Sequence, residues 1–336
     1  MNYNMKEWFS SLLKENHKKP FPILSFPAIS LLGITVEELI SDENMQAKAM
    51  VRVAEECDSL ASVNMMDLSV EAEAFGAEIR VSKDEVPTVV GRIVETEEDA
   101  DNLKIPSLDA GRCMRYVKAV GMASERITDR PVFSGAIGPF SLAGRLMDMT
   151  EIMVNCLIEP DMVHKTLEKT TEFIITYMKA FRENGANGVV LAEPVAGLLS
   201  PDLNAEFSVP YVKKIVDAVQ TDEFAVVYHN CGNTVPLLDD ILTLGASAYH
   251  FGNAIDMMDV LPKVDKNIIV MGNVDPAGEF RGGTPDSIRE KTIALLEKCT
   301  PNHPNFVLSS GCDIPPLTPW ENIHAFFKAS EEYYQK

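Results

Sequence analysis

The stretch from residue 188 to residue 274 contains four short apolar runs, GVVLAEP (188–194), AVVYHNC (225–231), AYHFGN (248–253) and IIVMGNV (268–274). These runs are too short for typical helices, and several are rich in β-branched residues, which favours buried strands. Each run leads directly into residues typical of turns. The sequence between the runs is longer and includes helix-like segments, so this stretch predicts strands that alternate with helices.

The same alternation extends outward to both ends of the chain. Four further apolar runs are FPILSFPA (21–28), SLASVNMM (59–66), VFSGAIGP (132–139) and FVLSSGC (306–312). Helices are expected between the runs, for example over 161–184 and over 285–299, where Thr284-Pro285-Asp286 can provide a cap and a first turn. Eight strands that are each followed by helical sequence predict an α/β fold, the (β/α)8 TIM barrel. A doubly wound open sheet would alternate similarly, but the glycine-rich first turn that usually accompanies it is absent from the sequence.

A single domain over residues 1–336 is expected, because α/β barrels often use a chain of this length as one domain. Additional helices are expected at the N-terminus. The long acidic interval from about 80 to 130 is expected to hold further helices between the second and third strands, with a solvated charged face.

The charge balance excludes several classes of function. The chain has 30 Lys and Arg residues against 50 Asp and Glu residues, a formal charge of −20. Binding to nucleic acid or to an anionic membrane surface depends on basic residues, so neither is expected. Hydrophobic residues make up 46% of the chain, which argues against disorder, and no apolar run is long enough to predict a membrane span.

The six cysteines are widely scattered and form no short-spaced disulfide framework. Together with an N-terminus that lacks the apolar core of a signal peptide, this predicts a cytoplasmic protein whose cysteines stay reduced. Four of them fall within helical patterns and are expected to be packing residues: Cys57, Cys113, Cys156 and Cys299.

The remaining two cysteines lie at expected strand ends, where TIM barrels place their functional residues. His229 and Cys231 are two positions apart on one strand, so their side chains point to the same face, and Cys312 ends another strand at the same mouth. One imidazole and two thiolates form a soft donor set that suits zinc, and a set of three leaves the open position typical of catalytic zinc. The alternative is that these cysteines are buried packing residues.

Two acidic residues end other expected strands. Glu193 ends the run 188–194, which neighbours the strand of His229, so its carboxylate is a candidate to reach the metal or a bound substrate. Asp67 follows the run 59–66 and is a candidate catalytic residue, with capping of the next helix as the alternative.

Three more polar residues lie within or at the end of the expected strands 248–253 and 268–274. Asn273 and Asp275 are candidates for cofactor binding, and the alternative is a tight turn in which they bond to their own backbone. His250 lies inside its strand and is expected to be a core histidine with satisfied hydrogen bonds.

Six stretches resemble the uroporphyrinogen decarboxylase superfamily in their order and placing, and the resemblance covers nearly the whole chain. They are MMDLSVEAEAFG (65–76), GAIGPFSLAGRLM (135–147), LLSPDLNAEFSVPYVKKIVDAV (198–219), YHNCG (228–232), GNVDP (272–276) and SSGCDIPPLTP (309–319). The resemblance implies the same (β/α)8 barrel that the strand pattern predicts.

Two branches of this superfamily differ at positions that can be compared here. The decarboxylases carry an arginine-bearing loop after the first strand that grips the porphyrinogen carboxylates, whereas residues 24–33 contain no arginine. Cys312 stands in place of a decarboxylase histidine, while Asp67 matches an aspartate in a motif that both branches share. The methylcobalamin:coenzyme M methyltransferases are marked by His-x-Cys on strand five and a cysteine after strand eight, and His229, Cys231 and Cys312 match both marks.

The resemblance to the second branch implies a zinc-dependent methyltransferase that moves a methyl group from methylcobalamin, or another methyl-corrinoid, to a thiol such as coenzyme M. His229, Cys231 and Cys312 would hold the zinc. Glu193 would be a fourth ligand in the resting state or a base for the thiol proton, and Asp67 would orient a ligand or contact the substrate.

The expected partners are a corrinoid protein and a small-molecule thiol, and a homodimer is a further expectation. Two alternatives stay open at this point: decarboxylation of a porphyrinogen without a metal, and a non-catalytic module that binds a corrinoid protein. The sequence does not identify the thiol.

Overall fold

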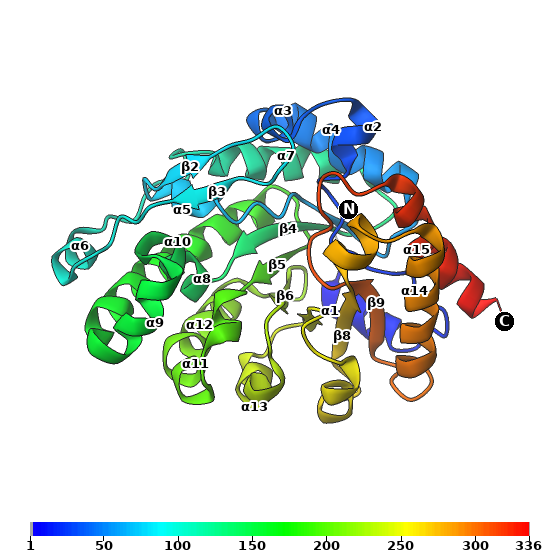
Figure 1. Ribbon diagram of the computed structural model, residues 1–336. Helices are drawn as coiled ribbons and strands as arrows, with labels where there is room; N and C mark the ends of the chain where they lie inside the picture. Colours follow the sequence, from blue (N-terminus) through cyan, green and yellow to red (C-terminus); the bar gives the residue numbers. More distant parts are fainter. Residues whose placement is uncertain (1–2, 336) are drawn as a thin grey trace.

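The computed structural model describes residues 3–335 and is built around a parallel sheet of seven strands. The strand order in the sheet follows the chain, β1-β4-β5-β6-β7-β8-β9, and helices lie around the outside (Figure 1). The strands of this sheet are β1 (Ser62–Val63), β4 (Val132–Ile137), β5 (Gly188–Ala192), β6 (Ala225–Asn230), β7 (Ala248–Phe251), β8 (Ile269–Val274) and β9 (Phe306–Ser310). The carboxyl ends of all seven strands therefore lie at one edge of the sheet, which confirms the predicted α/β barrel class.

The connections between the strands are largely helical. The α-helices are α1 (Met5–Leu12), α2 (Ala28–Leu32), α3 (Val36–Ser41), α4 (Glu43–Glu56), α5 (Val70–Ala74), α6 (Glu97–Asn102), α7 (Cys113–Arg126), α8 (Pro139–Met147), α9 (Met149–Ile158), α10 (Pro160–Glu183), α11 (Pro201–Phe207), α12 (Val209–Val219), α13 (Leu238–Ile241), α14 (Pro285–Cys299) and α15 (Trp320–Tyr334). Shorter helical segments are η1 (Val195–Leu198), η2 (Val235–Leu237), η3 (Leu242–Leu244), η4 (Met257–Asp259), η5 (Leu261–Lys263) and η6 (Pro276–Arg281). The helices predicted over 161–184 and 285–299 are confirmed as α10 and α14, and Thr284 caps α14 by accepting a hydrogen bond from the Ser287 backbone N–H.

The prediction of a strand over residues 21–28 is wrong. This segment lies where the eighth strand of a barrel would lie, between β9 and β1, but it forms no ladder with either. Single backbone hydrogen bonds join it to the two sides, from Phe21 N to Leu308 O at 2.8 Å and from Leu60 N to Pro20 O at 2.9 Å. Serine side chains of β9 bond to two more of its backbone groups, because Ile23 N donates to Ser310 Oγ and Ser309 Oγ donates to Phe21 O. The carbonyl oxygen of Ile23 accepts from the backbone N–H of Ile314, which lies beyond β9.

The acidic interval from 80 to 130 holds helices α6 and α7, as predicted. The structure adds a feature that the sequence pattern did not indicate, an antiparallel hairpin of β2 (Glu78–Arg80) and β3 (Thr88–Val90). Its alternate residues are exposed and half-buried, so it lies at the surface rather than in the main sheet.

Two groups of buried apolar side chains cover the two faces of the sheet, one inside the barrel and one outside it. Val190, Ala192, Val227, Ala248 and Val307 belong to the inner group, together with side chains of the N-terminal helix α1. The alternating residues on the same strands belong to the outer group, which packs beneath the helices. Since side chains alternate along a strand, His229 on β6, His250 on β7 and Ser309 on β9 share the inner side with these residues.

Within residues 3–335, none of the helices combines the length and the apolar character that crossing a lipid bilayer requires.

Candidate metal centre

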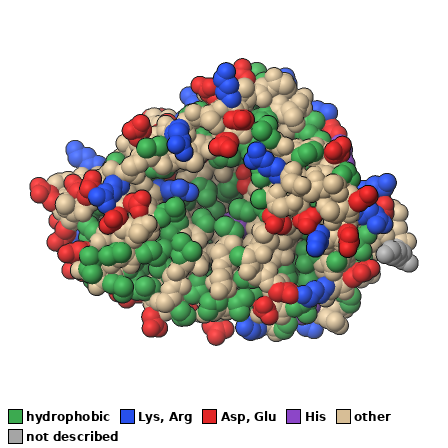
Figure 2. All heavy atoms as spheres, viewed as in Figure 1, with side chains coloured by type: hydrophobic (Ala, Val, Ile, Leu, Met, Phe, Trp, Pro, Cys, Tyr) green, Lys and Arg blue, Asp and Glu red, His purple; other side chains and the backbone are tan. Residues whose placement is uncertain are grey.

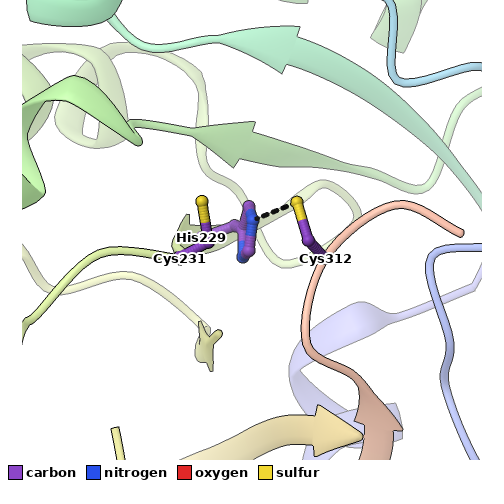
Figure 3. Close-up of side chains that lie close together, drawn as sticks. All are labelled: His229, Cys231 and Cys312. Carbon is purple, nitrogen blue, oxygen red and sulfur yellow. Dashed lines mark hydrogen bonds between the residues drawn. The ribbon is translucent and has the colours of Figure 1, made fainter. Parts of the chain in front are cut away.

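Three predicted ligands come together where β6 and β9 end. The ligand atoms of His229, Cys231 and Cys312 all lie within 4.8 Å of one another. Figure 3 shows the two cysteines on either side of the imidazole, with both sulfur atoms pointing the same way. The Cys312 sulfur is 3.5 Å from Nε2 of His229, so this nitrogen is the one that faces the cluster. The strand alternation and the closure of the barrel together bring one nitrogen and two sulfur donors to one point.

Glycine at position 252 allows this close approach. A Cβ atom at Gly252 would lie 2.5 Å from Cα of Cys231, 2.7 Å from its Cβ and 2.9 Å from the Gly311 carbonyl oxygen. Two of these neighbours are backbone atoms, which cannot move aside cheaply. The bare backbone at Gly252 therefore sets the spacing between the two segments that carry the cysteines.

The two clustered cysteines differ in charge. The pKa of the Cys231 thiol is lowered to about 4, chiefly because Cys312 donates a hydrogen bond to its sulfur, against the effect of burial. The same hydrogen bond, together with burial, raises the pKa of the Cys312 thiol well above its ordinary value. At neutral pH the pair therefore holds a single proton, and Cys231 already has the thiolate form that binds metals.

The other four cysteines are buried packing residues, as predicted. Burial raises the pKa of the Cys57, Cys156 and Cys299 thiols to about 12, and it raises the pKa of Cys113 as well. The cluster at the barrel mouth is therefore chemically distinct from the rest of the cysteines.

Behind the cluster lies a buried row of polar side chains that the sequence did not mark as functional. Nδ1 of His229 is 2.8 Å from Nδ1 of His250, whose Nε2 is 2.7 Å from Oγ of Ser309. The prediction that His250 is a core histidine with satisfied hydrogen bonds is confirmed, since it is 2% exposed and both ring nitrogens have partners. The signal that could have linked it to the cluster is register, because His250 pairs directly with His229 across β6 and β7.

Asp67 is enclosed by hydrogen-bond donors. Its carboxylate accepts bonds from Arg112 Nη1 at 2.5 Å, from the Tyr116 hydroxyl at 2.7 Å, and from both the backbone N–H and the hydroxyl of Ser69. The side chain is fully buried, and Arg112 also bonds to Glu73 at 2.6 Å. These contacts show how Asp67 is held, and its catalytic role stays a prediction.

Glu193 faces the start of helix α8. Its two carboxylate oxygens accept hydrogen bonds from the backbone N–H groups of Phe140 at 3.1 Å and Ser141 at 2.6 Å, so the side chain satisfies donors at the helix N-terminus. Burial raises the pKa of this carboxyl to about 7, and the bonds from Ser141 and Phe140 oppose the rise. Its proposed role as a fourth ligand or as a base also stays a prediction.

Asn273 and Asp275 bond to the backbone at the ends of β7 and β8. The amide of Asn273 donates to the carbonyl oxygens of Gly252 and Ile255, both at 2.9 Å. Asp275 accepts from the backbone N–H groups of the two residues that begin η6 after Pro276. Asp275 matches the turn alternative, whereas Asn273 bonds to the loop that follows β7 and not to its own turn. Binding of a cofactor by these residues stays a prediction.

Asp313 is a further acid, half-buried, that the sequence did not single out, although it directly follows Cys312. Burial, with a further effect from Asp67, raises the pKa of its carboxyl well above the ordinary value. Its Oδ1 atom has no hydrogen-bond partner among the residues that the structure describes. These surroundings therefore favour the neutral form of the carboxyl beside the cluster.

The donor set fits zinc. It combines an imidazole nitrogen with two cysteine sulfurs at separations that one ion can bridge, and the described residues contribute no further His, Cys, Asp or Glu to the group. Three protein donors leave a position for a substrate atom. The face shown in Figure 2 is hollowed at its centre, with hydrophobic side chains in the hollow and both acidic and basic side chains around it.

Comparison with known proteins gives one family and several related enzymes. The family model for uroporphyrinogen decarboxylase (URO-D) matches residues 27–333. The chain is 30% identical to "Methylcobamide:CoM methyltransferase MtbA" of Methanosarcina mazei over 93% of this chain and 94% of that protein. It is 27% identical to "Methylcobamide:CoM methyltransferase MtaA" of Methanosarcina barkeri, over 93% and 95% of the two chains. A solved structure, "methyltransferase from Methanosarcina mazei", superposes with a TM-score of 0.86 at 26% identity, covering 97% of this chain and 98% of that one.

Proposed function

The chain belongs to the uroporphyrinogen decarboxylase family, and from that premise we propose that it is a methyltransferase that moves a methyl group from a methyl-corrinoid to a thiol such as coenzyme M. The observation that carries the proposal is the convergence of His229, Cys231 and Cys312 at the mouth of a barrel whose relatives are methylcobamide:CoM methyltransferases. A soft donor set with an open position is what activation of a thiol requires.

We propose that these three side chains hold zinc. Nε2 of His229 faces the two sulfurs, Cys231 is deprotonated at neutral pH, and Cys312 would release its proton on binding the metal. Zinc in this position would supply Lewis acidity that lowers the pKa of a coordinated thiol and so keeps the substrate sulfur as a thiolate.

Two neighbouring residues help to shape the barrel mouth around the proposed metal ligands. Gly252 permits the close approach of the segments that carry the cysteines, and Asn273 fixes the loop that follows β7. The methyl donor would be presented by a corrinoid protein as partner, since the relatives are named for a methylcobamide donor. A reducing compartment such as the cytoplasm suits a site that depends on free thiolates.

Decarboxylation of a porphyrinogen receives less support. Such a substrate carries many carboxylates, and residues 24–33 offer no arginine to hold them. A metal is not needed for that reaction, whereas this chain places three metal donors at its mouth.

The test is zinc analysis of the purified protein combined with a panel of thiols assayed with methylcobalamin, followed through the visible spectrum of the corrinoid. The proposal expects one zinc per chain and demethylation with at least one thiol. Both should be lost in Cys231→Ala and in Cys312→Ala, whereas the matched control Cys299→Ala, which removes a buried cysteine elsewhere, should retain them.

Each contrary result has a distinct meaning. Stoichiometric zinc in the Cys231→Ala/Cys312→Ala double variant would overturn the ligand assignment. Bound zinc without turnover of any thiol would favour a corrinoid-protein binding module. Metal-independent loss of carboxyl groups from a porphyrinogen would support the decarboxylase alternative.

A further inference from the structure

Three inward-facing side chains form a continuous hydrogen-bonded row inside the barrel. His229, His250 and Ser309 come from β6, β7 and β9, and their exposed fractions are 1%, 2% and 0%. The row continues to the backbone of the irregular first segment, because Ser309 Oγ donates to the carbonyl oxygen of Phe21 at 2.6 Å. One end of the row therefore faces the metal centre, and the other end is a carbonyl group.

The carbonyl end determines where the hydrogen atoms lie. A carbonyl oxygen only accepts, so the single hydroxyl hydrogen of Ser309 points to Phe21. Ser309 Oγ must then accept the hydrogen bond at 2.7 Å from Nε2 of His250, so Nε2 carries a hydrogen. In neutral His250 the other nitrogen, Nδ1, is consequently an acceptor.

A second, independent contact leads to the same order at His229. Its Nδ1 lies 2.8 Å from Nδ1 of His250 and 3.3 Å from the His250 carbonyl oxygen. Because the carbonyl can only accept, Nδ1 of His229 must be the donor in this pair of contacts. Nε2 of His229 then has a free lone pair, and this is the atom that lies 3.5 Å from the Cys312 sulfur.

We propose that His250 and Ser309 are positioning residues that hold His229 in the Nδ1–H tautomer, with the Nε2 lone pair directed at the metal. This inference rests on the proposed function only in naming the metal. Groups that orient a metal-binding imidazole commonly change metal affinity by about 10- to 100-fold when they are removed. Here the group that orients the imidazole is another histidine, whose own tautomer is fixed by a serine.

A role in packing alone predicts a different pattern among variants. His250→Phe fills a similar volume but removes the acceptor for His229, whereas His250→Asn leaves a gap but keeps an oxygen close to the position of Nδ1. The proposal expects zinc to bind about 10- to 100-fold more weakly to His250→Phe and only slightly more weakly to His250→Asn. A packing role would reverse this order.

The experiment measures zinc affinity by competition with a chromophoric chelator, and the tautomer of His229 by nitrogen-15 NMR of the metal-free protein. Ser309→Ala provides a milder variant that retains both histidines, and it should weaken zinc binding and populate the Nε2–H tautomer of His229. Ser134→Ala is the matched control, because Ser134 is a buried strand serine whose hydroxyl bonds only to a backbone carbonyl.

The two readouts separate this inference from the proposed function. An Nε2–H tautomer of His229 in the wild-type protein, or unchanged zinc affinity in both His250→Phe and Ser309→Ala, would overturn the inference. An Nδ1–H tautomer in the wild-type protein that becomes less populated in Ser309→Ala, in a protein that binds no zinc, would refute the zinc assignment and leave the proposed hydrogen-bond directions intact.

Discussion

Replacing Arg112 with alanine should destabilise the fold more than replacing its partner Asp67 with asparagine. The two side chains form a buried ion pair at 2.5 Å, with exposed fractions of 8% for Arg112 and 0% for Asp67. Arg112 has a second anionic partner in Glu73 at 2.6 Å, whereas Asp67 has no other cation among its described contacts. Replacing Arg112 therefore leaves the Asp67 carboxylate without a cation, whereas replacing Asp67 leaves the Arg112 guanidinium paired with Glu73.

The magnitudes follow from this asymmetry. Arg112→Ala leaves a buried carboxylate with neutral partners only, and breaking a buried pair in this way costs about 3–5 kcal/mol. Asp67→Asn leaves the guanidinium paired with Glu73 and keeps an acceptor oxygen, so the loss is close to that of one hydrogen bond to a charged group, about 2 kcal/mol. The double variant should cost less than the sum of the two single variants, because it leaves no unpaired charge.

Urea unfolding followed by circular dichroism measures these differences as shifts of the midpoint at constant slope. Arg289→Ala is the control, since it breaks an ion pair with Glu332 of similar length, 2.7 Å, in which Arg289 is half exposed, and it should cost less than about 1 kcal/mol. A larger loss for Asp67→Asn than for Arg112→Ala would refute the reasoning. An Asp67→Asn protein of wild-type stability without methyl transfer would show instead that Asp67 acts on the substrate or a ligand.

Three further predictions concern the surroundings of the site. Burial raises the pKa of Glu71 to about 8, above the value of about 4.5 in the unfolded chain, so the stability that it contributes is complete below pH 4.5 and is lost as the pH rises towards 8. The contribution of Glu71 alone should lower the free energy of unfolding by about 1.4 kcal/mol per pH unit in this window, and Glu71→Gln should remove that part of the fall in urea titrations. Gly252→Ala should weaken zinc binding at least about tenfold in chelator competition, because the added Cβ would lie 2.5 Å from Cα of Cys231. In metal-free protein at pH 6, iodoacetamide should label Cys231 before any other cysteine, as mass spectrometry of peptides can show, because its lowered pKa makes it a thiolate there.

Each of these predictions has a result that would contradict it. An unchanged pH profile in Glu71→Gln would mean that another group causes the dependence. Gly144→Ala controls for the glycine variant, because the nearest atom to its added Cβ is 3.5 Å away, and an equal loss of zinc affinity in both variants would remove the steric argument. Faster labelling of Cys312 than of Cys231 would reverse the assignment of the shared proton.

Local pattern was sufficient to predict the cluster but not its surroundings. The two-residue spacing of His229 and Cys231 places them on one side of a strand, and the barrel rule adds Cys312 at another strand end. The partners of Asp67 could not be found this way, because Arg112 lies 45 positions along the chain and reaches it only after α7 packs beside the barrel. Likewise, the backbone N–H groups that donate to Glu193 belong to α8, so the sequence pattern of the strand that carries Glu193 could not predict them.

The wrong prediction of a strand over 21–28 and the hydrogen order at His229 have one physical cause. The apolar composition of this run correctly predicted burial, since Phe21 and Ile23 are 2% and 1% exposed, but not the kind of partner that their backbone would meet. In a regular ladder the Phe21 carbonyl would accept from a backbone N–H, and the hydroxyl hydrogen of Ser309 would be free to point at His250. Here that hydrogen goes to Phe21, so Ser309 accepts from His250 and His229 keeps its Nε2 lone pair for the metal centre. The irregular segment 21–28 therefore helps to keep the Nε2 lone pair of His229 available, although it lies outside the sheet.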